Sequence, residues 1–186
     1  MDKKTTEQLL YLSDKSYLSR TEIQFHSLAL VRNWLINGNN PNYINKDGNP
    51  AWWLAMSSGI EESVDELILA GANINIKNEN NINWVMACLD YNMSLWVFQN
   101  GFKNIKIKWW EPDDFGRSPL FSEKLTPQML HLLCSHLYGN FISWENLKIN
   151  GVYPEDFFKD KNQEIYKTFI YWKKRMKFNQ PIKYRK

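Results

Sequence analysis

The sequence predicts an all-α protein made of helix-turn-helix units stacked into a solenoid, with a helical cap at each end. A glycine- and asparagine-rich phrase recurs as GNNPN at 38–42, GANIN at 71–75 and GFKNI at 101–105. A second phrase runs in step with it, so that Gly48 and Gly116 lie 68 positions apart, twice 34. A period near 33 residues is typical of units that complete their core only by stacking on neighbours. No stretch shows the apolar-polar alternation of a half-buried strand.

The length of the chain leaves room for one sizeable domain, or for a small domain with appendages. The 186 residues are 15% aromatic and include nine tryptophans, which predicts a core rich in large rings. Two cysteines, Cys88 and Cys134, fit a reducing compartment. The N-terminus has no apolar stretch suited to a signal sequence, and no window is apolar enough for a membrane span. We therefore expect a cytoplasmic monomer that does not associate with membranes.

Charge is unevenly placed along the chain. Residues 161–186 contain nine basic residues and one acid, a net +8, whereas residues 1–160 contain 14 basic and 19 acidic residues, a net −5. The formal net charge of +3 hides this asymmetry.

The helices are expected in three segments of the chain. Residues 1–20 are predicted to form an N-terminal helical cap. Within 21–138 we expect about three repeat units after a partial first one, with helices ending at Gly38, over 51–57 and 61–69, over 84–89, and from 95 to a stop at Gly101. A third unit begins at Asp113 after an insert at 106–112, and Pro127 favours the start of its second helix, which runs to about 136.

The last segment, 139–186, is predicted to be a helical cap with a basic tail. A turn of helix is expected at 143–147, another helix opens at Pro154, and Asp160 is expected to cap a long helix to about 177. Apolar residues at 165, 169, 172 and 176 form the stripe of that helix. Pro181 is expected to end it.

These phrases resemble the ankyrin repeat. That family has a unit of about 33 residues, a Gly-Ala-Asp-x-Asn loop and a Thr-Pro-Leu-His-x-Ala helix start. GANIN at 71–75 matches the loop, and GRSPLF at 116–121 follows the helix start with Ser for Thr and Phe for His. The resemblance covers roughly 20–138. The family histidine is replaced by Trp53, Val85 and Phe121, so packing is expected to replace its hydrogen bonds.

The resemblance implies a concave surface of loops and inner helices that binds a macromolecule. It places the following residues on or near the loops: Lys46, Asp47, Asn49, Glu79, Asn81, Asp113, Asp114 and Arg117. It places Ser57, Ser58 and Asp90 at the ends of inner helices. Five of these eleven are acidic and two are basic, which favours a positively charged partner. The alternative is that they are ordinary solvated loop residues.

Trp109 and Trp110 of the insert have two interpretations. Exposed, they would be interface anchors. Buried, they would pack the longer loop onto the last unit. Both remain open from the sequence.

Function follows from the resemblance as a hypothesis. Small, degenerate, cytoplasmic ankyrin proteins with individual surfaces resemble bacterial immunity proteins, which cover the active region of a toxin. An acidic surface would suit a basic toxin. A protein-binding role without catalysis is therefore expected, and no cofactor.

The residues that could carry chemistry have weaker patterns. His131, Cys134 and His136 are metal-ligand types, but on a helix His136 points about 140° away from His131, so no metal site is expected. A Cys–His pair between His26 and either cysteine has no local support. The acidic pairs at 61–62, 65–66 and 113–114 are typical of solvated helix surfaces and helix N-termini.

The basic tail supports a rival function. Its cations are interleaved with aromatic residues, an arrangement that can bind phosphates and stack on bases. The cations are Lys173, Lys174, Arg175, Lys177, Lys183, Arg185 and Lys186, and the rings are Tyr171, Trp172, Phe178 and Tyr184. The tail could alternatively cap the stack or bind another acidic partner.

Overall fold

The computed structural model describes residues 27–178 of the chain, and within them the fold is all-α, as predicted. The only β-type pairings of the described residues are two isolated bridges, Ile44 with Pro50 and Ile149 with Val152. The chain divides into two compact units, 1–105 and 106–186. The expected N-terminal cap at 1–20 and the tail beyond 178 lie outside the described residues.

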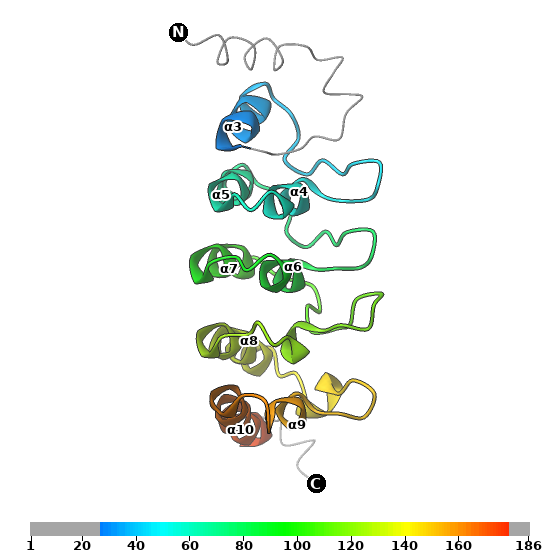
Figure 1. Ribbon diagram of the computed structural model, residues 1–186, viewed down its shortest axis with the longest axis vertical. Helices are drawn as coiled ribbons and strands as arrows, with labels where there is room; N and C mark the ends of the chain where they lie inside the picture. The colour runs from blue at the N-terminus through cyan, green and yellow to red at the C-terminus, as the bar shows by residue number, and fades with distance from the viewer. Residues whose placement is uncertain (1–26, 179–186) are drawn as a thin grey trace. The chain divides into compact units, whose positions relative to one another are not determined.

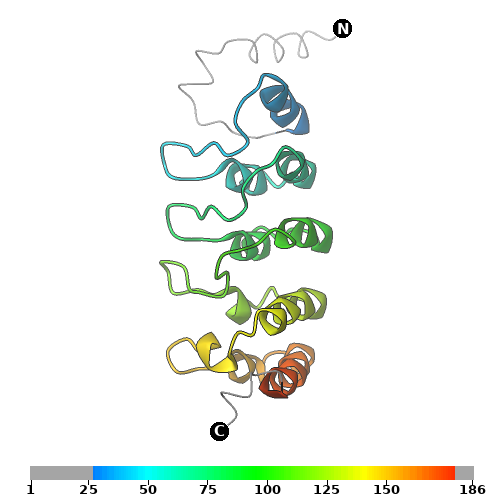
Figure 2. The same ribbon diagram turned by 180° about the vertical axis from the view of Figure 1, so that it is seen from behind.

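The described part of the first unit has five α-helices in two rows (Figure 1). They are α3 (Leu28–Ile36), α4 (Ala51–Ser57), α5 (Glu61–Leu69), α6 (Trp84–Asp90) and α7 (Leu95–Phe102). Helix α5 contacts α3 on one side and α7 on the other, which makes one row, and α4 contacts α6 in the second. The loops that precede α4 and α6 project to the same side, as both views show (Figures 1 and 2).

Local sequence sets where these helices begin and end. The side chains of Ser27, Asn83 and Ser94 accept hydrogen bonds from the backbone three residues later, capping α3, α6 and α7. Gly38 and Gly71 follow α3 and α5 with positive φ values, as predicted. The predicted ranges 51–57 and 61–69 are confirmed.

One predicted helix stop is wrong. Gly101 was expected to end its helix, but it lies inside α7, which continues to Phe102. A Cβ atom at position 101 would lie 2.3 Å from Cε2 of Trp84, so the glycine lets the Trp84 indole lie directly against the α7 backbone. The Trp84 ring also meets Trp52 edge-on, with centroids 5.4 Å apart. The repeated glycine therefore serves packing here.

The described part of the second unit contains three α-helices and two short 3₁₀ helices. They are η1 (Pro119–Phe121), α8 (Pro127–Gly139), η2 (Trp144–Leu147), α9 (Pro154–Phe158) and α10 (Gln163–Phe178). Helix α10 packs on α8 and α9, and α9 packs on η1. Thr126 caps α8 through Met129 N. Asn162, and not the predicted Asp160, caps α10, because its Oδ1 accepts from the backbone of Glu164 and Ile165.

The stripe predicted for α10 forms the core of the second unit. Ile165, Phe169 and Met176 are buried, and Trp172 is half-buried. The Phe169 ring stacks on Phe158 of α9 at 5.7 Å. The apolar face of this helix is therefore covered, and its opposite face is exposed.

Candidate binding surface

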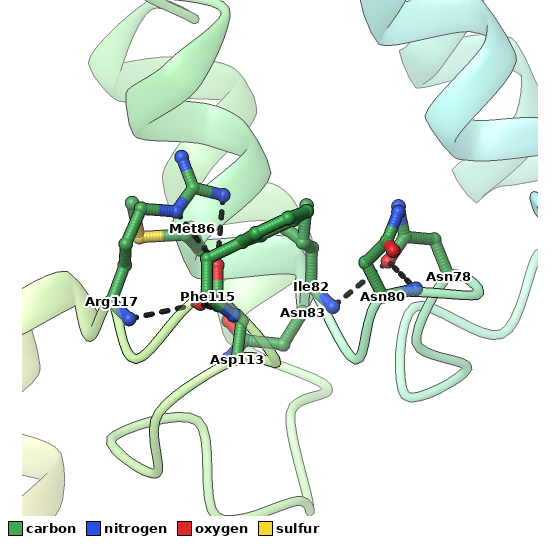
Figure 3. Close-up of polar contacts among 8 residues, drawn as sticks. All are labelled: Asn78, Asn80, Ile82, Asn83, Met86, Asp113, Phe115 and Arg117. Carbon is green, nitrogen blue, oxygen red and sulfur yellow. Dashed lines mark hydrogen bonds and ion pairs between the residues drawn. The ribbon is translucent and has the colours of Figure 1, made fainter.

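The two projecting loops of the first unit have the same hydrogen-bond pattern. In the loop before α4, Oδ1 of the buried Asn45 accepts from the backbone N–H groups of Asp47 and Asn49, at 3.1 and 2.8 Å. In the loop before α6, Oδ1 of the buried Asn78 accepts from Asn80 and Ile82, also at 3.1 and 2.8 Å (Figure 3). A buried amide thus holds each loop from beneath by binding the residues two and four positions later.

The loop before η1 in the second unit has the same pattern with a carboxylate. Oδ1 of Asp113 accepts from the backbone N–H groups of Phe115 and Arg117 (Figure 3). Its other oxygen, Oδ2, accepts from Arg117 Nε at 2.8 Å, and the Arg117 guanidinium completes an ion pair. Asp113 is buried, so its carboxylate supports the loop and is not presented at the surface.

The loops of the first unit touch each other. Gly48 has a φ of 76°, and a Cβ atom there would lie 2.9 Å from Cβ of Glu79. A side chain at position 48 would therefore meet both an unfavourable backbone conformation and the neighbouring loop. This close approach brings the sequence-predicted residues Asp47 and Asn49 next to Glu79.

The loop tips carry most of the predicted binding residues of this unit. Lys46, Glu79 and Asn81 are exposed, while Asp47 and Asn49 are half-buried. Charged and polar side chains of both loops thus lie at one joined surface.

The predicted residues at the helix ends differ in what they offer. Both Ser57 and Ser58 direct their hydroxyls to the carbonyl of Leu54, at 2.8 and 3.1 Å. Their donor hydrogens are therefore used within their own helix. Asp90 is half-buried at the end of α6, and its charge, after burial, raises the pKa of the Tyr91 hydroxyl.

An aromatic pair on the inner helices was missed by sequence reasoning. Trp53 of α4 meets Tyr91, which follows α6, edge-on with centroids 5.2 Å apart. Both side chains are half-buried. Counted from the loop residues Asn45, Asn78 and Asp113, Trp53 occupies the same position as Met86 and Phe121. The alignment of the repeats by sequence instead placed Val85 at the position equivalent to Trp53. In the structure the equivalent residue is Met86, one position later.

The Trp109-Trp110 question is answered by burial. Trp109 is fully buried in the second unit, and its Nε1 donates to Nδ1 of His136 at 3.3 Å. Its assignment to a partner-binding surface is therefore wrong, because the ring is part of the core. Trp110 is half-buried and meets Trp109 edge-on.

In the loop before η1, the exposed aromatic residue is instead Phe115 at the tip, 64% exposed, with the Arg117 guanidinium 5.4 Å from its ring centre. Asp114 beside it is exposed. No sequence signal separated Phe115 from buried rings.

The residues considered for chemistry have structural roles. His131 and His136 each accept a hydrogen bond from a tryptophan N–H, Trp172 and Trp109 respectively. Burial raises the pKa of the Cys88 and Cys134 thiols, and the charge of Glu61 adds to this at Cys88. Both thiols therefore stay protonated at neutral pH. His26 lies outside the described residues.

Across residues 27–178 no three His, Cys, Asp or Glu side chains come together as a metal site would require. In the same part of the chain, no helix combines the length and apolar character needed to cross a bilayer.

The described parts of the two units have opposite net charge. Residues 27–105 contain seven acidic and four basic side chains, a net −3, and residues 106–178 contain nine acidic and twelve basic ones, a net +3. The acidic unit is the one whose loops touch.

No protein-family model matches the sequence, and no curated protein matches it.

Proposed function

We propose that this chain is a non-catalytic, ankyrin-like repeat protein that acts as an immunity protein, sequestering a basic toxin through the joined loops and inner helices of its first unit. The observation that carries the proposal is the contact between the two loops of that unit, Gly48 against Glu79. It creates a continuous surface from side chains 31 or more residues apart in the sequence.

The repeat assignment rests on geometry that recurs. The buried loop residues Asn45, Asn78 and Asp113 are spaced by 33 and 35 positions and bind the backbone in the same way. Within the first unit, a second set of contacts also recurs: Asn42 accepts from Asn73 N, and Asn75 donates to Asn104 O. Side-chain amides thus link each turn to the next.

Charge supports the choice of a basic partner. The net −3 of residues 27–105 includes Asp47 and Glu79 on the adjoining loops. Acidic groups at the edge of an interface accelerate encounter with a cationic surface and discriminate against acidic proteins. Trp53 and Tyr91 are residue types that supply interface anchors.

The protein-binding proposal is tested by pull-down, with the wild type and charge-reversed variants of this chain as baits. The double variant Asp47→Lys/Glu79→Lys should lose at least about tenfold in affinity for the native partner, mostly through slower association at low salt. Glu62→Lys is the matched control, since Glu62 is exposed on α5, in the other row of helices. The partner should be a basic protein that is recovered with the wild type and the control and lost with the double variant. Equal recovery by all three baits would contradict the proposed surface.

The immunity proposal needs a separate test. Each neighbouring gene of the source genome is expressed in a host cell with and without this chain, and growth is measured. Growth arrest by one product, relieved by the wild type and by Glu62→Lys but not by the double variant, is the expected result. If no neighbouring product binds or is neutralised, the immunity role is wrong even where another protein partner is found.

A further inference from the structure

The exposed face of α10 carries a cationic and aromatic surface that protein binding by the first unit does not use. We define the α10 patch as Lys167, Tyr171, Trp172, Lys174 and Arg175 of α10 with His131 of α8. At 100° per residue, positions 167, 171, 174 and 175 fall within about a third of the helix circumference. We propose that the α10 patch binds single-stranded nucleic acid.

The rings of the patch are held in a fixed arrangement. Trp172 Nε1 donates to His131 Nδ1 at 2.9 Å, and Tyr171 meets both the Trp172 and His131 rings edge-on, with centroids 5.5 and 6.1 Å apart. The Arg175 Nη1 atom donates to the Tyr171 hydroxyl at 2.9 Å. Its guanidinium lies 5.5 to 5.8 Å from the ring centres of Tyr171, Trp172 and Tyr138.

Tyr171 keeps an accessible ring in spite of these contacts. It is 47% exposed, whereas Ile165 and Phe169 of the same helix are fully buried. An exposed, oriented ring is suited to stacking on an unpaired base, which is worth about 1–3 kcal/mol per base in single-strand complexes.

The cations of the patch are not neutralised by acids of the described chain. Lys167 and Lys174 are exposed and form no ion pair there, and Arg175 contacts rings and a hydroxyl. Lys173 differs, because it pairs with the buried Glu155. From 165 to 178 the helix has no acidic residue, and Glu164 marks the N-terminal end of the exposed face. Phosphate groups would supply the missing negative charge.

The combination of ring and charge selects the ligand. A duplex hides its base faces, so it could use the cations but not Tyr171. An acidic protein offers carboxylates without stacking bases. The apolar face of α10 is covered by α8 and α9, so the helix cannot insert that face into a lipid surface.

The test measures binding of a labelled oligothymidylate and oligouridylate of about ten nucleotides by fluorescence anisotropy with the full chain. Tyr171→Ala should weaken binding about 5- to 150-fold, and Tyr171→Phe, which keeps the ring, should bind nearly as the wild type does. The double variant Lys167→Gln/Lys174→Gln should reduce the slope of log K against log salt by about 1.4, since each phosphate contact to a single strand contributes about 0.7. Lys159→Gln, an exposed lysine at the end of α9, is the matched control and should change little.

Two further results decide between ligands. A duplex of the same length and polyglutamate should both compete poorly with the single strand. If either competes as well as the oligonucleotide, or if Tyr171→Ala binds as tightly as Tyr171→Phe while its circular dichroism and melting match the wild type, the proposal is wrong. The lysine variants change exposed side chains only, so they keep the test valid even where Tyr171→Ala fails to fold.

Discussion

The indole of Trp84 lies so close to the α7 backbone that position 101 has no room for a side chain. A Cβ atom there would overlap Cε2, Cζ2 and Nε1 of Trp84, all within 2.6 Å. Trp84 is fully buried and cannot move outward. Gly139 of α8 is also helical, but a Cβ atom there would meet nothing within 4 Å. Of the two helical glycines, position 101 therefore has no room for a side chain, whereas position 139 does.

Gly101→Ala should lower the free energy of unfolding by about 1–3 kcal/mol, because the added methyl overpacks the Trp84 contact. Gly139→Ala should raise it by about 0.5–1 kcal/mol, because alanine restricts the unfolded chain at no steric cost. Urea unfolding followed by circular dichroism measures both. Equal effects of the two substitutions would show that the Trp84 contact is not tight.

Asp65 of α5 should make stability depend on pH. Its pKa is raised from 3.8 to about 6, chiefly by burial and further by Glu61, Glu62 and Glu66, while the Asn100 hydrogen bond opposes the shift. The folded state therefore holds this proton more tightly than the unfolded state does, so its contribution to stability is complete below pH 4 and is lost as pH rises through 6. Since Asp65 is only half-buried, solvent screening reduces the change in the free energy of unfolding to a fraction of the value that the pKa shift alone would give.

The measurement is urea unfolding of the wild type and Asp65→Asn at pH 4, 5, 6 and 7. The wild type should lose stability relative to the variant between pH 4 and pH 6. A difference that stays constant with pH would contradict the assignment.

Single residues show where sequence reasoning succeeds and where it stops. Burial of Ile165, Phe169 and Met176 followed from helical spacing, because periodicity reports which face is covered. Trp109 and Phe115 could not be told apart in the same way. Both lie in irregular segments, where no period relates position to burial, and their exposures of 0% and 64% depend on tertiary contacts.

At the scale of elements, the three loops show how one turn is built from two kinds of side chain. Asn45 and Asn78 are amides, and the residues four positions later are Asn49 and Ile82, which carry no charge. Asp113 is a carboxylate, and the residue four positions later is Arg117, which pairs with it. A buried carboxylate is therefore used where a guanidinium neutralises it, in accordance with the cost of burying an isolated charge.

The pairing of a buried carboxylate with an arginine four positions later can be introduced into the loop before α4. Asn45→Asp keeps the Oδ1 acceptor but buries an unpaired charge, and should cost about 1–3 kcal/mol at pH 7. Adding Asn49→Arg should recover most of that loss. The Asn49 Oδ1 atom is buried and accepts no hydrogen bond from the described residues, so its removal is not itself costly.

A double-mutant cycle in urea, with Asn49→Arg alone as the third corner, measures the coupling. If the effects of Asn45→Asp and Asn49→Arg are additive, an arginine four positions after the carboxylate does not stabilise it by itself. Other groups around Asp113 would then account for the stability of the Asp113–Arg117 pair.

Element boundaries were largely predictable for physical reasons. Caps and stops act locally, so the ranges of α4 and α5 followed from Pro, Gly and apolar spacing, as did the start of α8 at Pro127. The stop expected at Gly101 was wrong because a distant indole determines that glycine. Contacts between loops, such as Gly48 with Glu79, have no local signal at all.

At the scale of the whole molecule, the division into units 1–105 and 106–186 should be visible in local unfolding. Gly101→Ala loosens a contact inside the first unit, and proteins open in cooperative subglobal units. Amide exchange should therefore accelerate in α4, α5, α6 and α7 and remain unchanged in α8 and α10. Hydrogen-exchange mass spectrometry of the wild type and the variant measures this. Acceleration throughout the chain would show that the two units unfold together.

The buried amide beneath each loop has a consequence for how this protein can change. Each loop is held from within by one side-chain amide, that of Asn45 or Asn78, which accepts hydrogen bonds from backbone N–H groups of the turn. Asp47 and Asn80 donate to these amides through their backbone, so substitution of their side chains leaves those bonds in place. A library randomised at positions 47 and 80, with Asn45, Gly48 and Asn78 kept, should fold in most members. New binding preferences could then arise by substitution at the tips, without rebuilding the framework that carries them.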